Sequence, residues 1–566
     1  MLASAFLRGR GCEVLSFTRL DDFARERLGM SGRELQSLAH VVNALVALPV
    51  LAAAFADGVL SWTQVRLLVA VARPETEARW LALAQDRTVR ALEAFIAAEA
   101  RARADGADSA EGGGTEPLID ACAVDRGRAA IDHARADSGS VIDGERVSSC
   151  RIRCPRWVSR LWRETVELAR RVSGEPLATW RAAEAIAAEG VSAVPLRYVT
   201  APFGIAGGTS AADPCETRSA IAEASGVDSL DWSAVVEALP ADVESLLDDL
   251  PADAHALDAR LRVAVSALRR IDWQLGRLLR LFFDCRLYAV LGFPSGSRYV
   301  RERLGISLRK VRSLIAVERK TWESPALMDA YRAGRISHLQ ALTLLPVIGE
   351  RHGAAWVRRA GEVTLRRLAD EVSWALDVQD TTVMWTPAAP PPADGRLVAP
   401  PAVQMRAWQD EVPSAEIAFR GPASVVAFFR ATVAAWRTPA TPEWCGVVGL
   451  LVHVTTEWQR AARHPDPVFA RDGWRCAVPA CSSRRNLHDH HIVFRSRGGD
   501  NTRDNRVTVC AWHHLRGIHA GRLRASGHAP DDVHWELGVR ADGAPLARFR
   551  GDRYEIVEVG GVSQAA

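Results

Sequence analysis

Three cysteines and one histidine near the end of the chain have the residue types and the spacing of a metal site. Four residues separate Cys476 from Cys481, and two separate Cys510 from His513. Zn²⁺ prefers four sulfur or nitrogen ligands in a tetrahedron, which two close pairs supply when they meet in space. The alternatives are unrelated core thiols or a Cys476–Cys481 disulfide, which would leave the second pair without a role. The spacing therefore predicts a structural Zn²⁺ site.

Further histidines surround this set: His488, His490, His491, His514 and His519. A neutral imidazole binds metal ions, and its unperturbed pKa of about 6.5 lets it take a proton from water near neutral pH. Phosphodiester hydrolysis needs an activated water, stabilisation of charge on the phosphate and help for the departing oxygen. Adjacent histidines beside a divalent ion are suited to that chemistry.

The order of residues in this stretch resembles the HNH nuclease family, in the subgroup that carries a structural zinc. The matching positions are Phe469–Cys476, Cys481, Leu487–Ile492, Gly498, Gly499, Asn505 and Cys510–His514. The resemblance covers about the last fifth of the chain. It is specific there, because many unlike residue types fall in the family's order and spacing.

The resemblance implies a small ββα-metal fold in which a strand ends with a metal ligand followed at once by the general base. On this sequence, His490 is the ligand and His491 is the base, while His514 completes metal binding from a helix. Asn505 matches the family's central Asn, which orients the base or contacts the metal. His519 is a further candidate ligand, ranked below His514 because a separation of five residues does not match one helical turn.

The same resemblance implies a DNA endonuclease with one catalytic divalent ion, Mg²⁺ or Mn²⁺, beside the structural Zn²⁺. His491 takes a proton from water, hydroxide attacks phosphorus in line, and the products carry a 5′ phosphate. One rival is a catalytically inactive, zinc-stabilised DNA-binding protein, and another is a helical interaction protein with a nuclease effector. Nothing in the sequence predicts the target sequence, DNA against RNA, or nicking against double-strand cutting.

Positive charge is concentrated in the same stretch. The chain has a net charge of +3, whereas residues His464–Ala529 contain 11 arginines and 5 aspartates, a net charge of +6. A phosphate-contacting face needs such an excess. Arg495, Arg497 and Arg506 are the candidates for DNA contacts, and a solvated arginine face explains each of them equally well.

Cysteine usage and hydropathy predict a cytoplasmic protein. Most of the 10 cysteines are scattered singly, as free thiols in a reducing compartment are. No secretory signal is visible. The apolar stretch over residues 41–60 is interrupted by Asn43, Pro49 and Asp57, so we interpret it as buried helices and expect no membrane partner.

The elements around this region include an internal duplication. Residues 17–96 match residues 293–372 at a constant offset of 276 without a gap. Phe17 pairs with Phe293, and Trp80 with Trp356. Identity at such unlike residue types indicates duplication rather than shared amphipathicity. Each copy is predicted to form several short helices, broken at Gly29 and Gly58 in the first copy.

One segment of each copy, from Arg27 to Arg33 and from Arg303 to Arg309, resembles the helix-turn-helix of ParB-like partition proteins. The functional interpretation is DNA docking through the second helix, with Arg33 or Arg309 near phosphates or bases. The alternative is a helical repeat used for packing, for self-association or for binding a protein partner. The two copies are also expected to pair with each other around a pseudo-two-fold axis.

The predicted fold class is mainly α, with a duplicated helical N-terminal region and a small C-terminal ββα-metal α+β domain. Residues 1–100 form copy 1 of the repeat, and a flexible linker over 101–150 leads to a helical segment with an irregular tail, 151–230. A long helix and copy 2 occupy 231–380. A Pro-rich spacer with a small α/β segment, 381–445, precedes the nuclease domain, 446–566.

Overall fold

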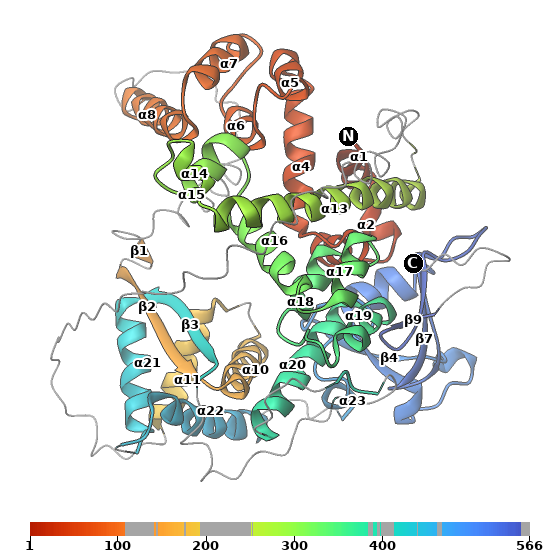
Figure 1. Cartoon of the computed structure of the whole chain (residues 1–566). Coiled ribbons are helices and arrows are strands. Elements are labelled where there is room, and N and C mark those ends of the chain that lie inside the picture. The colour runs from red at the N-terminus through yellow and green to blue at the C-terminus, as the bar shows by residue number, and fades with distance from the viewer. Residues whose placement is uncertain are drawn as a thin grey trace.

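The computed structural model describes residues 1–107, 141–142, 145–174, 177–192, 251, 253–382, 389–392, 397, 413–438, 440–460 and 467–555. It is mainly helical with a small C-terminal antiparallel β region, as predicted (Figure 1). Most of the predicted linker, the irregular tail beyond residue 192 and most of the Pro-rich spacer lie outside the described residues. No described helix is both long and apolar enough to cross a membrane.

The duplication is visible in every helix of the repeat. Copy 1 comprises α1 (Leu2–Arg8), α2 (Gly11–Val14), α3 (Leu20–Phe23), η1 (Ala24–Leu28), α4 (Gly32–Leu45), α5 (Pro49–Ala56), α6 (Trp62–Leu68), α7 (Glu77–Asp86) and α8 (Val89–Ala107). Copy 2 comprises the end of α13 (Ala254–Asp284), α14 (Leu287–Val290), α15 (Gly296–Tyr299), η5 (Val300–Leu304), α16 (Leu308–Thr321), α17 (Pro325–Arg332), α18 (His338–Leu344), α19 (Gly353–Glu362) and α20 (Leu365–Thr382). The bounds of α4, α5, α6 and α7 map residue for residue onto those of α16, α17, α18 and α19 at the offset of 276.

Serines at equivalent positions cap two pairs of equivalent helices. Ser31 caps α4 and Ser307 caps α16, each by accepting a hydrogen bond from a backbone N–H of the first turn. Helices α6 and α18 both begin with a capping box, formed by Ser61 with Gln64 in copy 1. Local sequence therefore places the helix starts identically in the two copies.

The two copies pack against each other around a pseudo-two-fold axis. Glu26 of copy 1 accepts from the backbone N of Leu365 at the start of α20, and Glu302 of copy 2 accepts from Val89 at the start of α8. The turns are reciprocal too: a Cβ at Gly29 would collide with Ser337, and a Cβ at Gly305 would collide with Ser61. The expected pairing of the copies is therefore present in the structure.

A second compact unit joins segments that the sequence predicted to be separate. Strand β2 (Glu145–Cys154), next to the short β1 (Val141–Ile142), pairs antiparallel with β3 (Ala415–Pro422). Helices α10 (Arg156–Ser173), α11 (Thr179–Ser192), α21 (Ala423–Ala435) and α22 (Glu443–Arg460) share one apolar core with these strands. The boundaries predicted for 101–150, 151–230, 381–445 and 446–566 thus divide this unit, because strand pairing across more than 250 residues leaves no local signal.

This unit is itself a duplication that our sequence reasoning missed. At an offset of 267, Pro155 corresponds to Pro422 and Thr165 to Thr432, and both prolines precede a helix. Both threonines donate a hydrogen bond to the backbone carbonyl four residues earlier. The equivalent residues Arg151 and Ala418 face each other across strands β2 and β3. The two halves of this unit are therefore also related by a pseudo-two-fold axis.

The C-terminal module, residues 467–555, follows these units. It contains α23 (Pro467–Arg471), a hairpin of β4 (Leu487–His491) with β5 (Arg506–Cys510), and η9 (His513–Ile518). The short turns η7 (Arg495–Arg497) and η8 (Arg503–Asn505) lie between the two strands. A separate antiparallel sheet follows, in the order β6 (Leu523–His528), β7 (Asp532–Leu537), β8 (Ala547–Arg550), β9 (Arg553–Tyr554). The apolar core of the module continues into copy 1: Leu15 and Phe17 of copy 1 belong to the same buried cluster as Val509 and Trp535 of the module.

Candidate metal centres

The predicted zinc ligands come together in the structure. Ligand atoms of Cys476, Cys481, Cys510 and His513 lie within 4.8 Å of one another, and all four residues are buried. Nδ1 of His513 is 3.3 Å from the Sγ atoms of both Cys476 and Cys510. Each of the three thiols is free, so the disulfide alternative is not present. Three sulfurs and one imidazole nitrogen are a donor set that Zn²⁺ prefers.

The second ring nitrogen of His513 is held by copy 1. Nε2 lies 3.1 Å from the backbone oxygen of Ser16 and donates to it, which leaves Nδ1 facing the sulfurs. Burial alone lowers the pKa of His513, but the adjacent Cys481 thiolate and its neighbours raise it to about 10. That increase reflects the negative charge that gathers at the cluster, which a bound cation would neutralise.

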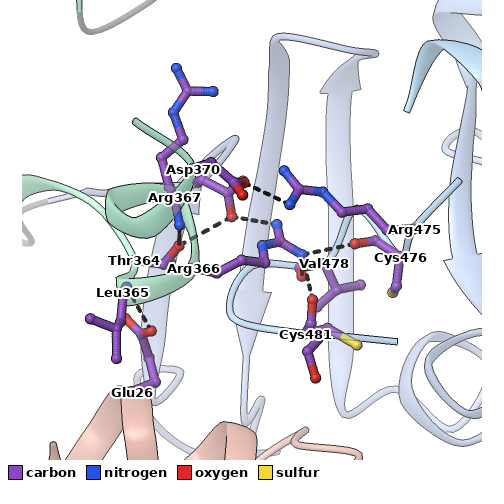
Figure 2. Close-up of polar contacts among 12 residues, drawn as sticks. Glu26, Thr364, Leu365, Arg366, Arg367, Asp370, Arg475, Cys476, Val478 and Cys481 are labelled. Carbon is purple, nitrogen blue, oxygen red and sulfur yellow. Dashed lines mark hydrogen bonds and ion pairs between the residues drawn. The ribbon is translucent and has the colours of Figure 1, made fainter. Parts of the chain in front are cut away.

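A buried arginine from copy 2 holds the loop between the first two cysteines (Figure 2). One guanidinium nitrogen of Arg366, in α20, donates to the backbone oxygens of Cys476, Val478 and Cys481. The other pairs with Asp552. The sequence carried no signal for this residue, because Arg366 precedes Cys476 by 110 positions.

Three histidines form a second candidate centre. Ligand atoms of His490, His514 and His519 lie within 4.8 Å of one another. Nε2 of His519 is 3.2 Å from Nε2 of His514. His490 is 2% exposed, and its Nε2 has no hydrogen-bond partner among the described residues. Burial, followed by the neighbouring imidazoles, lowers the pKa of His490 to about 4, so its ring is neutral. A buried ring nitrogen without a hydrogen-bond partner, placed among other imidazoles, has the chemistry of a metal ligand.

The local backbone explains why His519 belongs to this group. Residues His513–Ile518 form a π-helix, in which the N–H of His519 donates to the oxygen of His514, five residues earlier. A π turn aligns positions i and i+5, whereas an α-helix aligns i and i+4. Our sequence-based ranking of His519 below His514 assumed the α spacing and does not apply here.

Two further side chains pack around the three histidines. Nδ1 of His488 is 2.8 Å from Nδ1 of His514, which leaves Nε2 of His514 directed at the group. The ring of Phe494 stacks on His519 at 5.5 Å between centroids and lies edge-on to His490. His488 was given no role from the sequence, although its alternation with His490 along one strand was a usable signal.

His491, the predicted base, lies next to this group at the end of β4 and is half-buried. Its Nε2 is 2.8 Å from Oδ1 of Asn501, a residue that our sequence reasoning did not select. Asn505 does not point its amide at a ligand: Oδ1 accepts from Val493 N, and Nδ2 donates to the oxygens of Val493 and Asp500. Asn505 thus holds the loop that follows His491.

Gly499 also helps to hold the loop that follows His491. Its Cα lies so close to the backbone oxygen of Val493 that a Cβ at this position would collide with it. Among the predicted DNA contacts, Arg495 and Arg497 are exposed beside this loop. Arg506 instead forms an ion pair with Asp489, so its charge is already neutralised.

The helix-turn-helix candidates lie elsewhere. Arg33 and Arg309 are exposed at equivalent positions near the starts of α4 and α16. The turns before these helices, at Gly29 and Gly305, each lie against a serine of the opposite copy. The turns therefore contribute to the packing of the two copies, while DNA docking through Arg33 or Arg309 stays a prediction.

Comparisons with known proteins identified no relative: no family model, no curated protein and no solved structure matches this chain. The function must therefore be argued from the two candidate metal centres themselves.

Proposed function

We propose that the C-terminal module is a metal-dependent endonuclease of the HNH type that hydrolyses DNA phosphodiester bonds. The observation that supports it most is the group of His490, His514 and His519, with an unpartnered buried nitrogen, next to a half-buried imidazole on the same strand. The group lies in the stretch of +6 net charge, which suits an anionic substrate.

The roles of the residues follow from their contacts. His491 accepts the proton of the attacking water, and Asn501 orients its ring through the contact at Nε2. Asn505 and Gly499 keep the following loop in place. Arg495 and Arg497, exposed on that loop, contact phosphate oxygens. A divalent ion held by the three histidines supplies stabilisation of charge at the phosphate.

The donor set bears on the identity of that ion. Three imidazole nitrogens are ligands for Zn²⁺, Ni²⁺ or another transition ion, whereas Mg²⁺ prefers oxygen. We therefore expect tighter binding of Ni²⁺ and Zn²⁺ than of Mn²⁺ at this group, and Mg²⁺ to be the weakest of the four. The Mg²⁺ that the family resemblance implied has no support in these ligands, while Mn²⁺ remains compatible with activity.

The test is plasmid cleavage by the full-length protein with each ion in turn. His490→Ala and His491→Ala should each lower the cleavage rate at least about a hundredfold, because removing a general base or a metal ligand costs that much. His528→Ala, an exposed histidine on β6, is the matched control and should cleave normally. DNA binding without cleavage under any ion would instead favour the zinc-stabilised DNA-binding protein.

Metal analysis separates the two centres. The wild-type protein should retain one tightly bound Zn²⁺ at the cysteine site after dialysis, and His490→Ala should retain it too. Equal cleavage by wild type and His491→Ala would reject the proposed base.

A further inference from the structure

The two copies of the repeat differ in what covers one equivalent face. On copy 1 this face carries the C-terminal module. Leu15 is 0% exposed within the shared core, and the carboxylate of Asp22 accepts from the backbone N of Ser482. We call this surface the platform. Arg27 lies beside it, buried in an ion pair with Asp258 of α13, and Arg366 reaches it from copy 2.

The equivalent surface on the other side of the pseudo-two-fold axis is open. Leu291, the counterpart of Leu15, is 56% exposed, and its neighbour Val290 is 82% exposed. Within the residues that the structure describes, no segment covers them. We call this surface the open face, and define it by Leu291, Arg298 and Arg303 of copy 2 with Arg90 of copy 1. These four lie on one face because their counterparts, Leu15, Asp22, Arg27 and Arg366, all surround the docked module.

The charge of this surface has changed between the copies. Asp22, which contacts the module, is replaced by Arg298, and Asp21 by Ser297. Arg303 and Arg90 are exposed, whereas their counterparts in the platform are buried and paired with carboxylates. No ion pair of Arg298, Arg303 or Arg90 occurs among the described residues. The Glu302 carboxylate lies beside them, where it accepts from the backbone N–H groups of Val89 and Arg90, so these four side chains together carry a net charge of +2.

A second module cannot take this position as the first does. Ser16, whose hydroxyl bonds to Arg522 and Gly538 of the module, is Gly292 in copy 2, and Thr18 is Pro294. The basic module would also meet like charge at Arg298, which costs binding energy. The open face instead suits an anionic partner.

We propose that the open face binds the phosphate backbone of duplex DNA, while the platform holds the nuclease module. Guanidinium groups match phosphate oxygens in geometry and charge, and several exposed arginines on one face are the electrostatic footprint of a surface that binds the nucleic-acid backbone. Duplication thus produced one copy that anchors the catalytic module and one that anchors the substrate. The choice of DNA over an acidic protein rests on the proposed function.

The experiment measures binding of a labelled duplex to the full-length protein without added divalent ions, at several salt concentrations. The test variant is Arg298→Gln/Arg303→Gln. Its control is Arg153→Gln/Arg420→Gln, which removes the same charge from exposed positions on β2 and β3. We expect the test variant to bind roughly tenfold more weakly and to lower the salt slope of log K by about 2, with no such change in the control.

The other outcomes overturn the proposal. Equal weakening in both variants would mean that only net charge matters, and no weakening in the test variant would show that DNA binds elsewhere. If polyglutamate competes as well as DNA at equal charge concentration, the partner is an acidic protein. Binding is measured without the catalytic ion, so it does not depend on cleavage. If the test variant has an unchanged salt slope and the wild-type protein cleaves plasmid normally, the open-face proposal is rejected and the proposed nuclease is not. Open-face binding without cleavage would reject only the proposed nuclease.

Discussion

Copy 1 and copy 2 of the repeat have equivalent helices and turns and share the serine caps of two helix pairs, yet they differ in what lies on them. Copy 1 shares its core with the C-terminal module and provides the carbonyl of Ser16 that holds His513, a candidate zinc ligand. Copy 2 keeps its own separate core and leaves the equivalent face uncovered among the described residues. Backbone architecture is thus preserved by caps and glycines, while a few side chains at the surface decide what each copy binds.

The largest expected effect comes from the zinc ligands. Cys510→Ala should destabilise the module and the adjoining part of copy 1 by at least about 5 kcal/mol, because a structural Zn²⁺ contributes folding free energy directly. Hydrogen exchange should show lost protection over residues 2–39, with the core of copy 2 still protected. Cys285→Ser, an exposed free thiol, is the control and should change neither. Equal loss of protection in both copies would contradict the asymmetry.

The next effect distinguishes two arginines at equivalent positions. Arg366→Gln should lower the free energy of unfolding by about 3–5 kcal/mol. The substitution leaves Asp552 without its ion-pair partner and three backbone carbonyls without their hydrogen-bond donor. Arg90→Gln, at the exposed counterpart, should change it by less than about 0.5 kcal/mol. Urea unfolding measures both values. Similar costs at the two positions would mean that the module does not depend on this contact.

A smaller effect tests what the copies share. Gly29→Ala and Gly305→Ala should each cost about 2–3 kcal/mol, since both residues have positive φ and both oppose a serine of the other copy. The two costs should be equal within error. Gly58→Ala, where φ is also positive but no atom lies within 4 Å, should cost only about 1 kcal/mol. Unequal costs for Gly29 and Gly305 would argue against the pseudo-symmetric interface.

The smallest effect is a pH dependence confined to copy 2. Burial lowers the pKa of His338 to about 4, and its ring bonds to Ser313 and Tyr331. Copy 1 has Trp62 at the equivalent position. Below pH 6.5 the imidazole of residue 338 is protonated in the unfolded chain, whereas in the folded protein it stays neutral down to about pH 4. The free energy of unfolding therefore falls as the pH is lowered from 6.5 to about 4. At pH 5.5 the loss is about 1 kcal/mol.

Thermal unfolding at pH 7.5 and 5.5 measures this loss. His338→Gln should remove the part that belongs to copy 2. The nearby Asp272 and Lys310 form an ion pair with each other. A pH dependence that survives in the variant would assign it to other groups.

Much of the candidate site was predictable because its members are close in sequence. The candidate zinc ligands occur as two short pairs, and His490 and His491 end a strand as the resemblance implied. Arg366, Asn501 and the π-turn that recruits His519 were not predictable. The first lies on a distant helix, the second has no distinctive spacing, and the third is a backbone irregularity that α-helical periodicity does not encode.

Local chemistry in the sequence determined the helix starts, the duplication and the types of metal ligand, because caps, glycine turns and paired cysteines act over a few residues. Only the tertiary structure decided which copy holds the module, that Asn505 holds a loop, and that Arg506 is neutralised by Asp489. Those outcomes depend on which surfaces meet. Contacts between residues hundreds of positions apart are selected by shape and charge in three dimensions, which a one-dimensional pattern does not contain.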